Sequence, residues 1–316
     1  MAERSLRHDP VMLEEVLDLF GGSDGGDYLD LTLGGGGHAQ AILEHHPRAR
    51  LTGVDRDAKT LAATSAKMEQ YGQRFRGFHV RFDLVDQVVG GGLEGAFDGI
   101  LMDLGMSSMQ VDDPSRGFGF EADADLDMRM DRSGGETAAD LLRRLSEKDL
   151  ADLLFQFGDE RRSRAIARRV VERRRQAPIR RTSELVDLVC RVLGGPRRGR
   201  IHPATRTFQA LRIAVNDELG CLGRALPKCV GWLRKGGVMA AISFHSGEDR
   251  LVKRFFREHH GGSLEVLTRK PLRPSERELD RNRRSRSAKL RAARRRGSAG
   301  ESPGPAPGSP SWISGS

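Results

Sequence analysis

The sequence predicts an α/β protein with a Rossmann-like parallel sheet and an inserted all-helical domain. Apolar runs of strand length alternate with helical spacing over roughly the first 100 residues, an order typical of parallel strands joined by right-handed crossovers. One of these runs leads into a glycine loop, Gly34 to Gly37, at a place where such sheets bind ligands. Beyond Asp103 the strand pattern stops, and residues 136–193 carry helical spacing alone, which predicts the insertion.

The expected elements follow in chain order. Apolar residues at helical spacing predict a helix over 11–20, ended by Gly21-Gly22. In the first part of the sheet domain we expect strands at 28–33, 50–54, 78–82 and 97–104, with helices at 38–45 and 57–70. After the insertion we expect a helix at 221–233, a strand at 237–244, a helix at 248–258 and a hairpin of 264–268 with 287–292.

These patterns divide the chain into two domains and a tail. The sheet domain comprises residues 1–106 and 218–296, and the inserted helical domain, expected to bind the substrate, comprises residues 107–217. Within the insertion, residues 159–176 are predicted to form one amphipathic helix with a strongly basic face. Residues 297–316 are rich in Gly, Pro and Ser, so this tail is expected to be disordered.

The charge of the chain indicates a nucleic-acid partner. Its 316 residues carry a formal net charge of +9, with a sequence pI near 10.0. Most of the excess is arginine, and the basic residues cluster instead of alternating with acids. The planar guanidinium suits bidentate contact with phosphate, so the clustering favours RNA or DNA as the partner.

Cysteine usage and hydropathy predict a cytoplasmic protein without a membrane segment. The three cysteines, Cys190, Cys221 and Cys229, show none of the spacings typical of metal sites, so we expect reduced thiols and no metal ion. No apolar run approaches the ~18–20 residues that a spanning helix needs, and residues 1–10 lack the pattern of a signal sequence.

The glycine loop and a downstream acid predict an adenosine-binding site. Glycine lacks a Cβ, so the backbone of this loop can approach a ligand closely, and the following helix points amide groups at it. Asp55 ends the second strand 21 residues after Gly34, near the ~20 expected for a carboxylate that binds ribose hydroxyls. The alternative interpretation is a tight turn followed by an unrelated strand-end Asp.

The form of the loop favours S-adenosylmethionine over NAD as the cofactor. The loop is not Gly-x-Gly-x-x-Gly, and no third glycine is available to face a pyrophosphate. Phe82, at the end of the third strand, is expected to cover the adenine, and Asp103 ends the fourth strand at the same edge. Taken alone, Phe82 could equally be a core residue and Asp103 a helix cap. Their predicted position at the same edge of the sheet favours contact with a ligand.

Motifs in a common order cover almost the whole chain. They occupy residues 8–17, 30–38, 53–57, 97–108, 126–131, 202–213, 242–250 and 284–291. Among them, Asp30-Leu-Thr-Leu-Gly-Gly-Gly-Gly-His38 and His202-Pro-Ala-Thr-Arg-Thr-Phe-Gln-Ala-Leu-Arg212 are the most informative. Together these motifs resemble the RsmH (MraW) type of ribosomal small-subunit RNA cytosine-N4 methyltransferase.

The resemblance implies a class I methyltransferase sheet with a helical domain inserted after the fourth strand, acting on a cytidine near the decoding centre of small-subunit rRNA. The chain departs from the family pattern at Gly247, where Leu is usual, at residues 124–129, which lack a Gly-Pro, and at Arg283, where Pro is common. His38 and Gln110 enter the predicted site through the resemblance alone. The implied cofactor contacts are Gly36, Gly37, His38, Asp55, Phe82, Asp103 and Gln110.

Two residues are candidates for contact with the reacting base. Cytosine N4 is a weak nucleophile because its lone pair is delocalised into the ring, so an acceptor for its N–H group would help. Asp103 is the first candidate, although many amino methyltransferases have a Pro-Pro-aromatic stretch where this chain has Asp103-Leu-Gly-Met106. His245 is the second, with a structural role as the alternative. Stacking surfaces for an unstacked base would come from residues that are equally candidates for the core: Phe118, Phe120, Phe208 and Phe244.

Four arginines are predicted to bind RNA. Arg168 and Arg169 lie on the basic helix, whereas Arg206 and Arg212 are six residues apart and need not share a helix face. We therefore expect at most one of the latter two to contact phosphate. The basic run at 283–296 is expected to contact RNA loosely as a tail. So large a basic surface favours the ribosomal small subunit over free cytidine as the substrate.

Two other functions remain compatible with these patterns. One is an RNA-binding ribosome assembly factor with a relic cofactor fold, against which the retained Gly-Gly-His and loop acids argue. The other is a DNA amino methyltransferase, which the missing Pro-Pro-aromatic stretch disfavours. The sequence leaves the oligomeric state open, a homodimer included.

Overall fold

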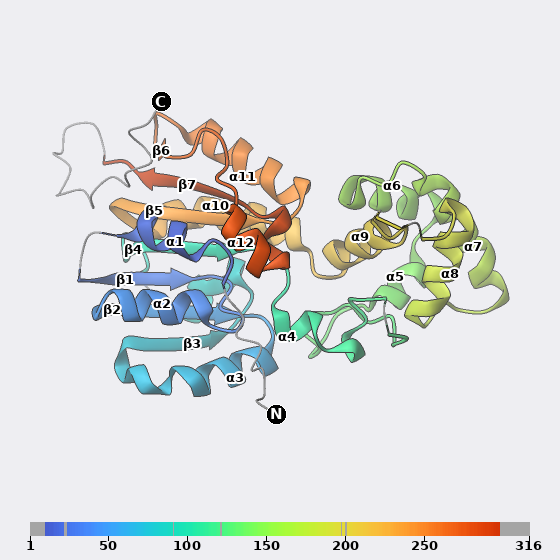
Figure 1. Ribbon diagram of the computed structural model, residues 1–316, viewed down its shortest axis with the longest axis horizontal. Helices are drawn as coiled ribbons and strands as arrows, with labels where there is room; N and C mark the ends of the chain where they lie inside the picture. Colours follow the sequence, from blue (N-terminus) through green and yellow to red (C-terminus); the bar gives the residue numbers. More distant parts are fainter. Residues whose placement is uncertain are drawn as a thin grey trace. The chain divides into compact units, whose positions relative to one another are not determined.

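Two units divide the part of the chain that the computed structural model describes, which is residues 10–21, 24–90, 92–120, 122–196, 198–199 and 201–297 (Figure 1). Unit 1 combines the residues up to Met106 with those from Leu219 onward, and unit 2 extends from Ser107 to Glu218. The predicted disorder of the tail concerns residues that, from 298 on, lie outside the described ranges.

A seven-stranded sheet organises the described residues of unit 1, in the order β3-β2-β1-β4-β5-β7-β6. The first five strands in this order are parallel, and β7 is antiparallel to both β5 and β6. This arrangement confirms the predicted α/β fold class. The strand order reverses between β1 and β4, and ligands of such sheets bind at that reversal. The strands are β1 (Gly25–Asp30), β2 (Arg48–Asp55), β3 (Phe75–His79), β4 (Phe97–Asp103), β5 (Leu233–Ser243), β6 (Leu264–Val266) and β7 (Lys289–Arg295).

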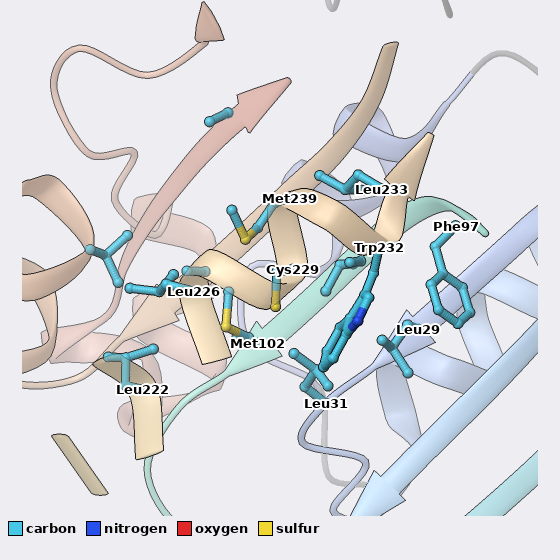
Figure 2. Packing of buried hydrophobic residues seen from close by; sticks show 14 of the residues in the cluster. Leu29, Leu31, Phe97, Met102, Leu222, Leu226, Cys229, Trp232, Leu233 and Met239 are labelled. Atoms are coloured by element: carbon cyan, nitrogen blue, oxygen red, sulfur yellow. The ribbon is translucent and has the colours of Figure 1, made fainter. Parts of the chain in front are cut away.

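Helices cover both faces of the sheet (Figure 1). Side chains alternate between faces along a strand, so Tyr28 packs with α1 and α2, whereas its neighbour Leu29 packs with α10 and α11. Figure 2 shows the second of these cores, in which Trp232 and Cys229 of α10 lie beside Leu31 and Met102. The α-helices of unit 1 are α1 (Leu13–Phe20), α2 (Gly37–His45), α3 (Ala58–Met68), α10 (Glu218–Trp232), α11 (Ser246–His259) and α12 (Glu276–Arg281), and α10 begins one residue before the unit boundary.

The third strand ends earlier than predicted. β3 ends at His79, and Phe82 opens a 3-10 turn (Phe82–Gln87), so the expectation that Phe82 closes a strand is wrong. The turn is held by Asp83, whose carboxylate accepts hydrogen bonds from the side chains of Arg81 and Arg224. Although burial raises the pKa of Asp83, the two guanidinium groups outweigh it and lower that pKa.

The regular secondary structure of unit 2 is helical in its described part, where no strand occurs, and the described residues of 117–137, between the first helices, form no helix. They are α4 (Ser108–Val111), a 3-10 turn (Pro114–Arg116), α5 (Ala138–Arg144), α6 (Glu147–Gly158), α7 (Ser163–Gln176), α8 (Thr182–Leu193) and α9 (Thr205–Val215). Helix α6 packs against α7 and α9. A Cβ on Gly158 would lie 2.5 Å from the carbonyl oxygen of Arg206, so only glycine permits this approach of α6 to α9.

The single basic helix predicted at 159–176 is wrong at its start. Asp159 adopts a left-handed conformation with φ of 51° and ends α6, and α7 begins four residues later. The Glu160 carboxylate accepts a hydrogen bond from the backbone N–H of Arg162 at 2.8 Å, which stabilises the turn between the helices. Arg162 therefore lies in the interhelical turn and not on the face of α7.

The basic run at 283–296 is not a loose tail. It forms a 3-10 turn (Arg283–Ser287) and then β7, whose Leu290, Ala292 and Ala293 are buried in the sheet. Arg291 is only 5% exposed, and its Nε–H donates to Asp249 at 2.7 Å. Some of the basic side chains of β7 are therefore paired with carboxylates of the same protein.

The described helices include none with the length and apolar character needed to cross a membrane. Cys190, Cys221 and Cys229 are free thiols, of which the first is half-buried and the other two are buried. Burial raises the pKa of the Cys229 thiol far above its ordinary value, so this side chain acts as a small apolar core residue.

Candidate active site

Three neighbouring parallel strands end in aspartates: β1 at Asp30, β2 at Asp55 and β4 at Asp103. Because the carboxyl ends of parallel strands share one edge of a sheet, the fold brings these carboxylates together. Asp30 and Asp55 are 2% and 8% exposed, and the side chain of Asp103 is 26% exposed. The strand-order reversal of the sheet therefore carries a partly open, acidic edge.

Asp55 anchors the glycine loop. Its Oδ2 accepts a hydrogen bond from the N–H of Gly34 at 2.9 Å, and its Oδ1 accepts one from the N–H of Asp57 at 2.8 Å. The Thr64 hydroxyl donates to the carbonyl oxygen of Gly34 at 2.6 Å, which fixes the loop from the other side. A carboxylate has about four acceptor positions, so Asp55 keeps capacity for ligand hydroxyls after these two contacts.

Gly36 and Gly35 differ in what surrounds them. Gly36 has φ of 75°, and a Cβ there would lie 2.6 Å from Cγ2 of Thr64. A Cβ on Gly35 would meet no atom within 4 Å, so the loop presents bare backbone to open space at that position. Backbone without a side chain is what a closely approaching ligand requires.

The variant Gly36→Ala is expected to lower the free energy of unfolding by about 2 kcal/mol, because a left-handed conformation costs an L-residue about 1–2 kcal/mol and the Thr64 methyl group must also move. Urea denaturation of the purified chain measures this loss. Gly35→Ala is the matched control, and its stability should equal that of the wild type. Equal losses in both variants would contradict the assignment of strain to Gly36.

Thr32 connects the ends of β1 and β4. Its N–H donates to Oδ1 of Asp30 at 3.0 Å, and its hydroxyl accepts a hydrogen bond from the N–H of Asp103 at 2.6 Å. The Oδ1 atom of Asp103 is buried and accepts no hydrogen bond from any described residue. A buried carboxylate oxygen without a donor is unfavourable, so this atom is suited to a donor group of a bound molecule.

His38 lies at the start of α2 and is 5% exposed. Burial lowers its pKa to about 4, so the ring is neutral at pH 7. The Nε2 atom lies 3.0 Å from the carbonyl oxygen of Val11 and therefore carries the proton, which leaves Nδ1 as an acceptor. Nδ1 lies 3.7 Å from Oδ2 of Asp103, beyond hydrogen-bond distance, so the two side chains are neighbours without a hydrogen bond between them.

The acidic edge is electrostatically unsatisfied. Burial raises the pKa of Asp30 to about 7 and that of Asp55 to about 6. Burial also raises the pKa of Asp103 well above its ordinary value, and the nearby carboxylates of Asp30 and Glu248 add to this. Within the described ranges, no lysine or arginine lies at ion-pair distance from Asp30, Asp55 or Asp103. A cationic ligand would relieve this repulsion.

The ligand-free protein is expected to lose stability as the pH rises from about 4 to about 7. The folded-state pKa of Asp30, about 7, exceeds the value of about 3.9 for an unfolded chain, so the folded state binds more protons in this window. Asp30→Asn keeps the acceptor for Thr32 and removes the titration, so its free energy of unfolding should depend less on pH. Denaturant unfolding across the window measures both curves, and parallel curves would refute the assignment to Asp30.

The predicted cofactor residues fall into two groups. The structure brings Gly36, His38, Asp55 and Asp103 together at the edge of the sheet. Gly37 lies beside Pro10, which a Cβ would approach to 3.2 Å, and Phe82 is half-buried against the core that contains α10. Gln110 belongs to unit 2, is 4% exposed, and forms a capping box with Ser107 at the start of α4.

His245 has a structural contact through Nδ1, whereas its buried Nε2 has no hydrogen-bond partner among the described residues. Its Nδ1 accepts a hydrogen bond from the N–H of Gly247, and its Nε2 lies 3.3 Å from Oε1 of Glu248. The other carboxylate oxygen of Glu248 accepts from the N–H groups of Phe244 and His245. His245 is thus the N-cap of α11, with a side chain only 7% exposed, and Gly247 does not prevent that helix from forming.

The sequence predictions did not include Thr32 or Thr64, and they gave no role to Asp30. Thr32 and Asp30 belong to the Asp-Leu-Thr that leads from β1 into the glycine loop, so a polar pair directly after a buried strand was the available signal. Thr64 comes from the middle of α3, 30 residues from its partner Gly34, and no local pattern indicates that contact.

The four arginines predicted to bind RNA have different environments. Arg168 lies 3.7 Å from Glu147 and Arg169 lies 2.8 Å from Glu172, both in exposed ion pairs. Arg212 is bound through two nitrogens to Glu218, and its side chain is 13% exposed. Arg206 is exposed, and among the described residues its side chain donates only to the carbonyl oxygen of Asp159. Arg206 is therefore the member of the α9 pair that is available to a partner.

Known proteins resemble this chain over almost its full length. Residues 5–296 match the family described as the MraW methylase family. The chain is 48% identical over 294 residues to "Ribosomal RNA small subunit methyltransferase H" of Cyanothece sp., covering 93% of this chain and 96% of that protein. It is 47% identical over 311 residues to the protein of the same name from Syntrophobacter fumaroxidans, covering 93% and 98% of the two chains. Identity to the Thermomicrobium roseum protein of that name is 46% over 309 residues, covering 92% and 94%.

Proposed function

Because the chain belongs to the MraW methylase family, we propose that it transfers a methyl group from S-adenosylmethionine to the N4 amine of a cytidine in small-subunit rRNA. The observation that carries the proposal is the acidic edge of the sheet, where three strand-end carboxylates have raised pKa values and one of them, Asp55, holds a bare glycine loop. Relatives with close to half of their residues identical are named small-subunit rRNA methyltransferases, which supports the substrate class.

The residues at the acidic edge fit S-adenosylmethionine. When bound, this cofactor would supply a methyl group on a positively charged sulfonium, whose carbon–sulfur bond breaks as a nucleophile bonds to the methyl carbon and the sulfur leaves as a neutral thioether. Asp55 would bind the ribose hydroxyls while it holds the loop through Gly34. The open side of Gly35 leaves room for a closely packed ligand. The negative charge of the edge favours a cation over the anionic pyrophosphate of a dinucleotide.

Asp103 is the residue that we assign to the amine of the base. A carboxylate that accepts the N4–H hydrogen bond draws the proton away from nitrogen and returns electron density to the attacking lone pair. Its raised pKa brings it closer to the working pH, where general bases are most effective. His38, neutral with Nδ1 as an acceptor, lies beside Asp103 and would help to orient the donor group.

We further propose that unit 2 binds the RNA and that the substrate is an assembled or partly assembled small subunit. The exposed arginines of α7 and of the turn before it extend over far more surface than one nucleotide covers. A ribosomal substrate would place the enzyme in the cytoplasm. Equal turnover on a short unstructured oligonucleotide would contradict this part of the proposal.

Mass mapping of methylated cytidine tests the reaction. Small subunits from a strain that lacks the enzyme should gain one N4-methylcytidine when incubated with the purified chain and S-adenosylmethionine. Methylation at another atom would overturn the N4 assignment alone. Failure to bind labelled S-adenosylmethionine at millimolar concentration would favour the alternative of an RNA-binding assembly factor. Methylation of DNA in preference to small subunits would favour a DNA amino methyltransferase.

A further inference from the structure

An open hollow of about 480 Å³ lies wholly within unit 2. Side chains from the turn before α7, the end of α8 and the segment that leads into α9 line it, among them Arg162, Leu193, Ile201, His202, Pro203 and Arg206. Its volume falls in the range of about 300–1,000 Å³ that is usual for small-ligand sites. The lining combines two cations and the carboxylate of Glu160 with an apolar wall, a mixture that differs from that of a packed core.

Arg162 and Arg206 are the uncommitted cations of this hollow. Both are exposed, and among the described residues neither side chain is paired with a carboxylate. Arg206 donates one N–H to the carbonyl oxygen of Asp159, which orients its guanidinium and leaves the other donors available. Glu160 also lines the hollow; one oxygen of its buried carboxylate accepts a hydrogen bond from the backbone N–H of Arg162, which holds this carboxylate in the turn before α7.

The apolar wall of the hollow consists of a stacked ring, that of His202, and an exposed side chain, that of Ile201. The His202 ring stacks on Phe120 with centroids 4.4 Å apart and 25° between the planes, and Phe120 meets the buried Phe208 edge-on. The N–H of Ala204 donates to Nδ1 of His202 and fixes the ring further. Ile201, next to it, is 77% exposed, which is unusual for a large apolar side chain beside two arginines.

We propose, on the basis of the function proposed above, that this hollow binds one unstacked nucleotide of the RNA substrate. The phosphate lies between the guanidinium groups of Arg162 and Arg206, whose planar forks match phosphate oxygens. The base lies against Ile201, since RNA-binding proteins take unstacked bases onto apolar or aromatic surfaces. The site is a second point of RNA contact, distinct in its residues from the acidic edge of unit 1.

The first test measures binding of the full-length chain to a fluorescent single-stranded RNA of 12 nucleotides, with no cofactor present, at several salt concentrations. The double variant Arg162→Ala/Arg206→Ala should bind about tenfold more weakly, and the slope of log Kd against log salt should fall by about 0.7, the value for one phosphate of a single strand. The corresponding double lysine variant should restore the slope and only part of the affinity, because lysine keeps the charge without the fork.

Arg180→Ala is the control for removing a positive charge elsewhere in unit 2, although it removes one charge and the double variant removes two. This arginine is exposed and lies just before α8, at the opposite end of that helix from Leu193. A helix of 12 residues is about 18 Å long, so Arg180 is far from the hollow within unit 2. We expect the affinity of the Arg180→Ala variant for the RNA to stay within about twofold of that of the wild type. A double variant that matches Arg180→Ala in both affinity and slope would overturn the proposal.

Ile201→Ser tests the apolar part of the site. It should weaken RNA binding about threefold and leave the salt slope unchanged, whereas an unchanged affinity would exclude contact between Ile201 and the base. Thermal unfolding of each variant monitors folding, which surface substitutions should not affect. With small subunits as substrate, the double variant should raise KM about tenfold at unchanged kcat. The two proposals can fail separately. If the wild-type chain transfers no methyl group but the double variant still binds RNA more weakly, the nucleotide site in the hollow is supported and only the proposed function is refuted.

Discussion

Asp103→Asn is expected to lower kcat for methyl transfer by about 100-fold or more, the range that follows removal of a general base. Asparagine keeps the shape of the side chain and the backbone hydrogen bond to Thr32, but it cannot draw a proton from the amine. The cofactor dissociation constant should stay within a few-fold of the wild type. Single-turnover kinetics with saturating small subunits and calorimetric titration of S-adenosylmethionine separate these two quantities.

The pH dependence distinguishes this role from a merely structural one. Burial, with the charges of Asp30 and Glu248, raises the pKa of Asp103, and the ionised form is the one that accepts the N–H. Wild-type kcat should therefore rise with pH through that pKa, and the profile of Asp103→Asn should be flat. Asp98→Asn, on the same strand but paired with Arg234 at its other end, is the control that should leave kcat unchanged. A kcat for Asp103→Asn within threefold of the wild type would refute the assignment.

Asp55→Ala is expected to weaken cofactor binding by at least about 100-fold. Hydrogen bonds to a charged group contribute about 1.5–3 kcal/mol each, and Asp55 is placed to accept from ribose hydroxyls. The variant also leaves the N–H groups of Gly34 and Asp57 without their acceptor, which should cost about 1–3 kcal/mol of folding free energy for each. Equilibrium binding of labelled S-adenosylmethionine and urea denaturation measure the two losses.

Asp57→Ala is the matched control for this experiment, because it removes a neighbouring buried aspartate. Asp57 caps α3 by accepting hydrogen bonds from the N–H groups of Lys59 and Thr60. Its removal should lower stability by about 1 kcal/mol, as for other N-caps, and leave cofactor affinity nearly unchanged. If both variants lose affinity equally, loop order and not ribose contact is the role of Asp55.

Local periodicity was sufficient to predict the succession of strands and most of the helices of unit 1, although β1 and β3 each begin three residues earlier than predicted. Strand and helix spacing depend on neighbouring residues, so β2, β4 and α2 were predicted to within two residues at each end. The end of β3 was wrong because Arg224, 141 residues away, binds Asp83 and fixes a turn there. The start of α7 was wrong because Asp159 adopts a left-handed conformation, which residue spacing does not reveal.

The residues of the candidate site that lie at the ends of strands could be predicted from the sequence. A carboxylate that ends a parallel strand must lie at the ligand edge, so Asp55 and Asp103 could be named from the sequence. Whether a side chain at such an end faces a ligand or supports the fold depends on contacts across the site. His245 caps α11, and Thr32 links two strands, and neither role has a signature in local sequence.

The antiparallel strand β7 has a consequence for how the protein is made. It pairs with β5 along Val238 to Ser243 and lies between β5 and β6, yet it is almost the last described segment to leave the ribosome. Until β7 is synthesised, the nascent chain presents β5 as an unpaired edge and leaves Asp249 without Arg291. Unit 2, which is continuous in sequence, has no such dependence. The sheet of unit 1 is therefore incomplete until β7 has been synthesised, by which point every residue of unit 2 has already been made.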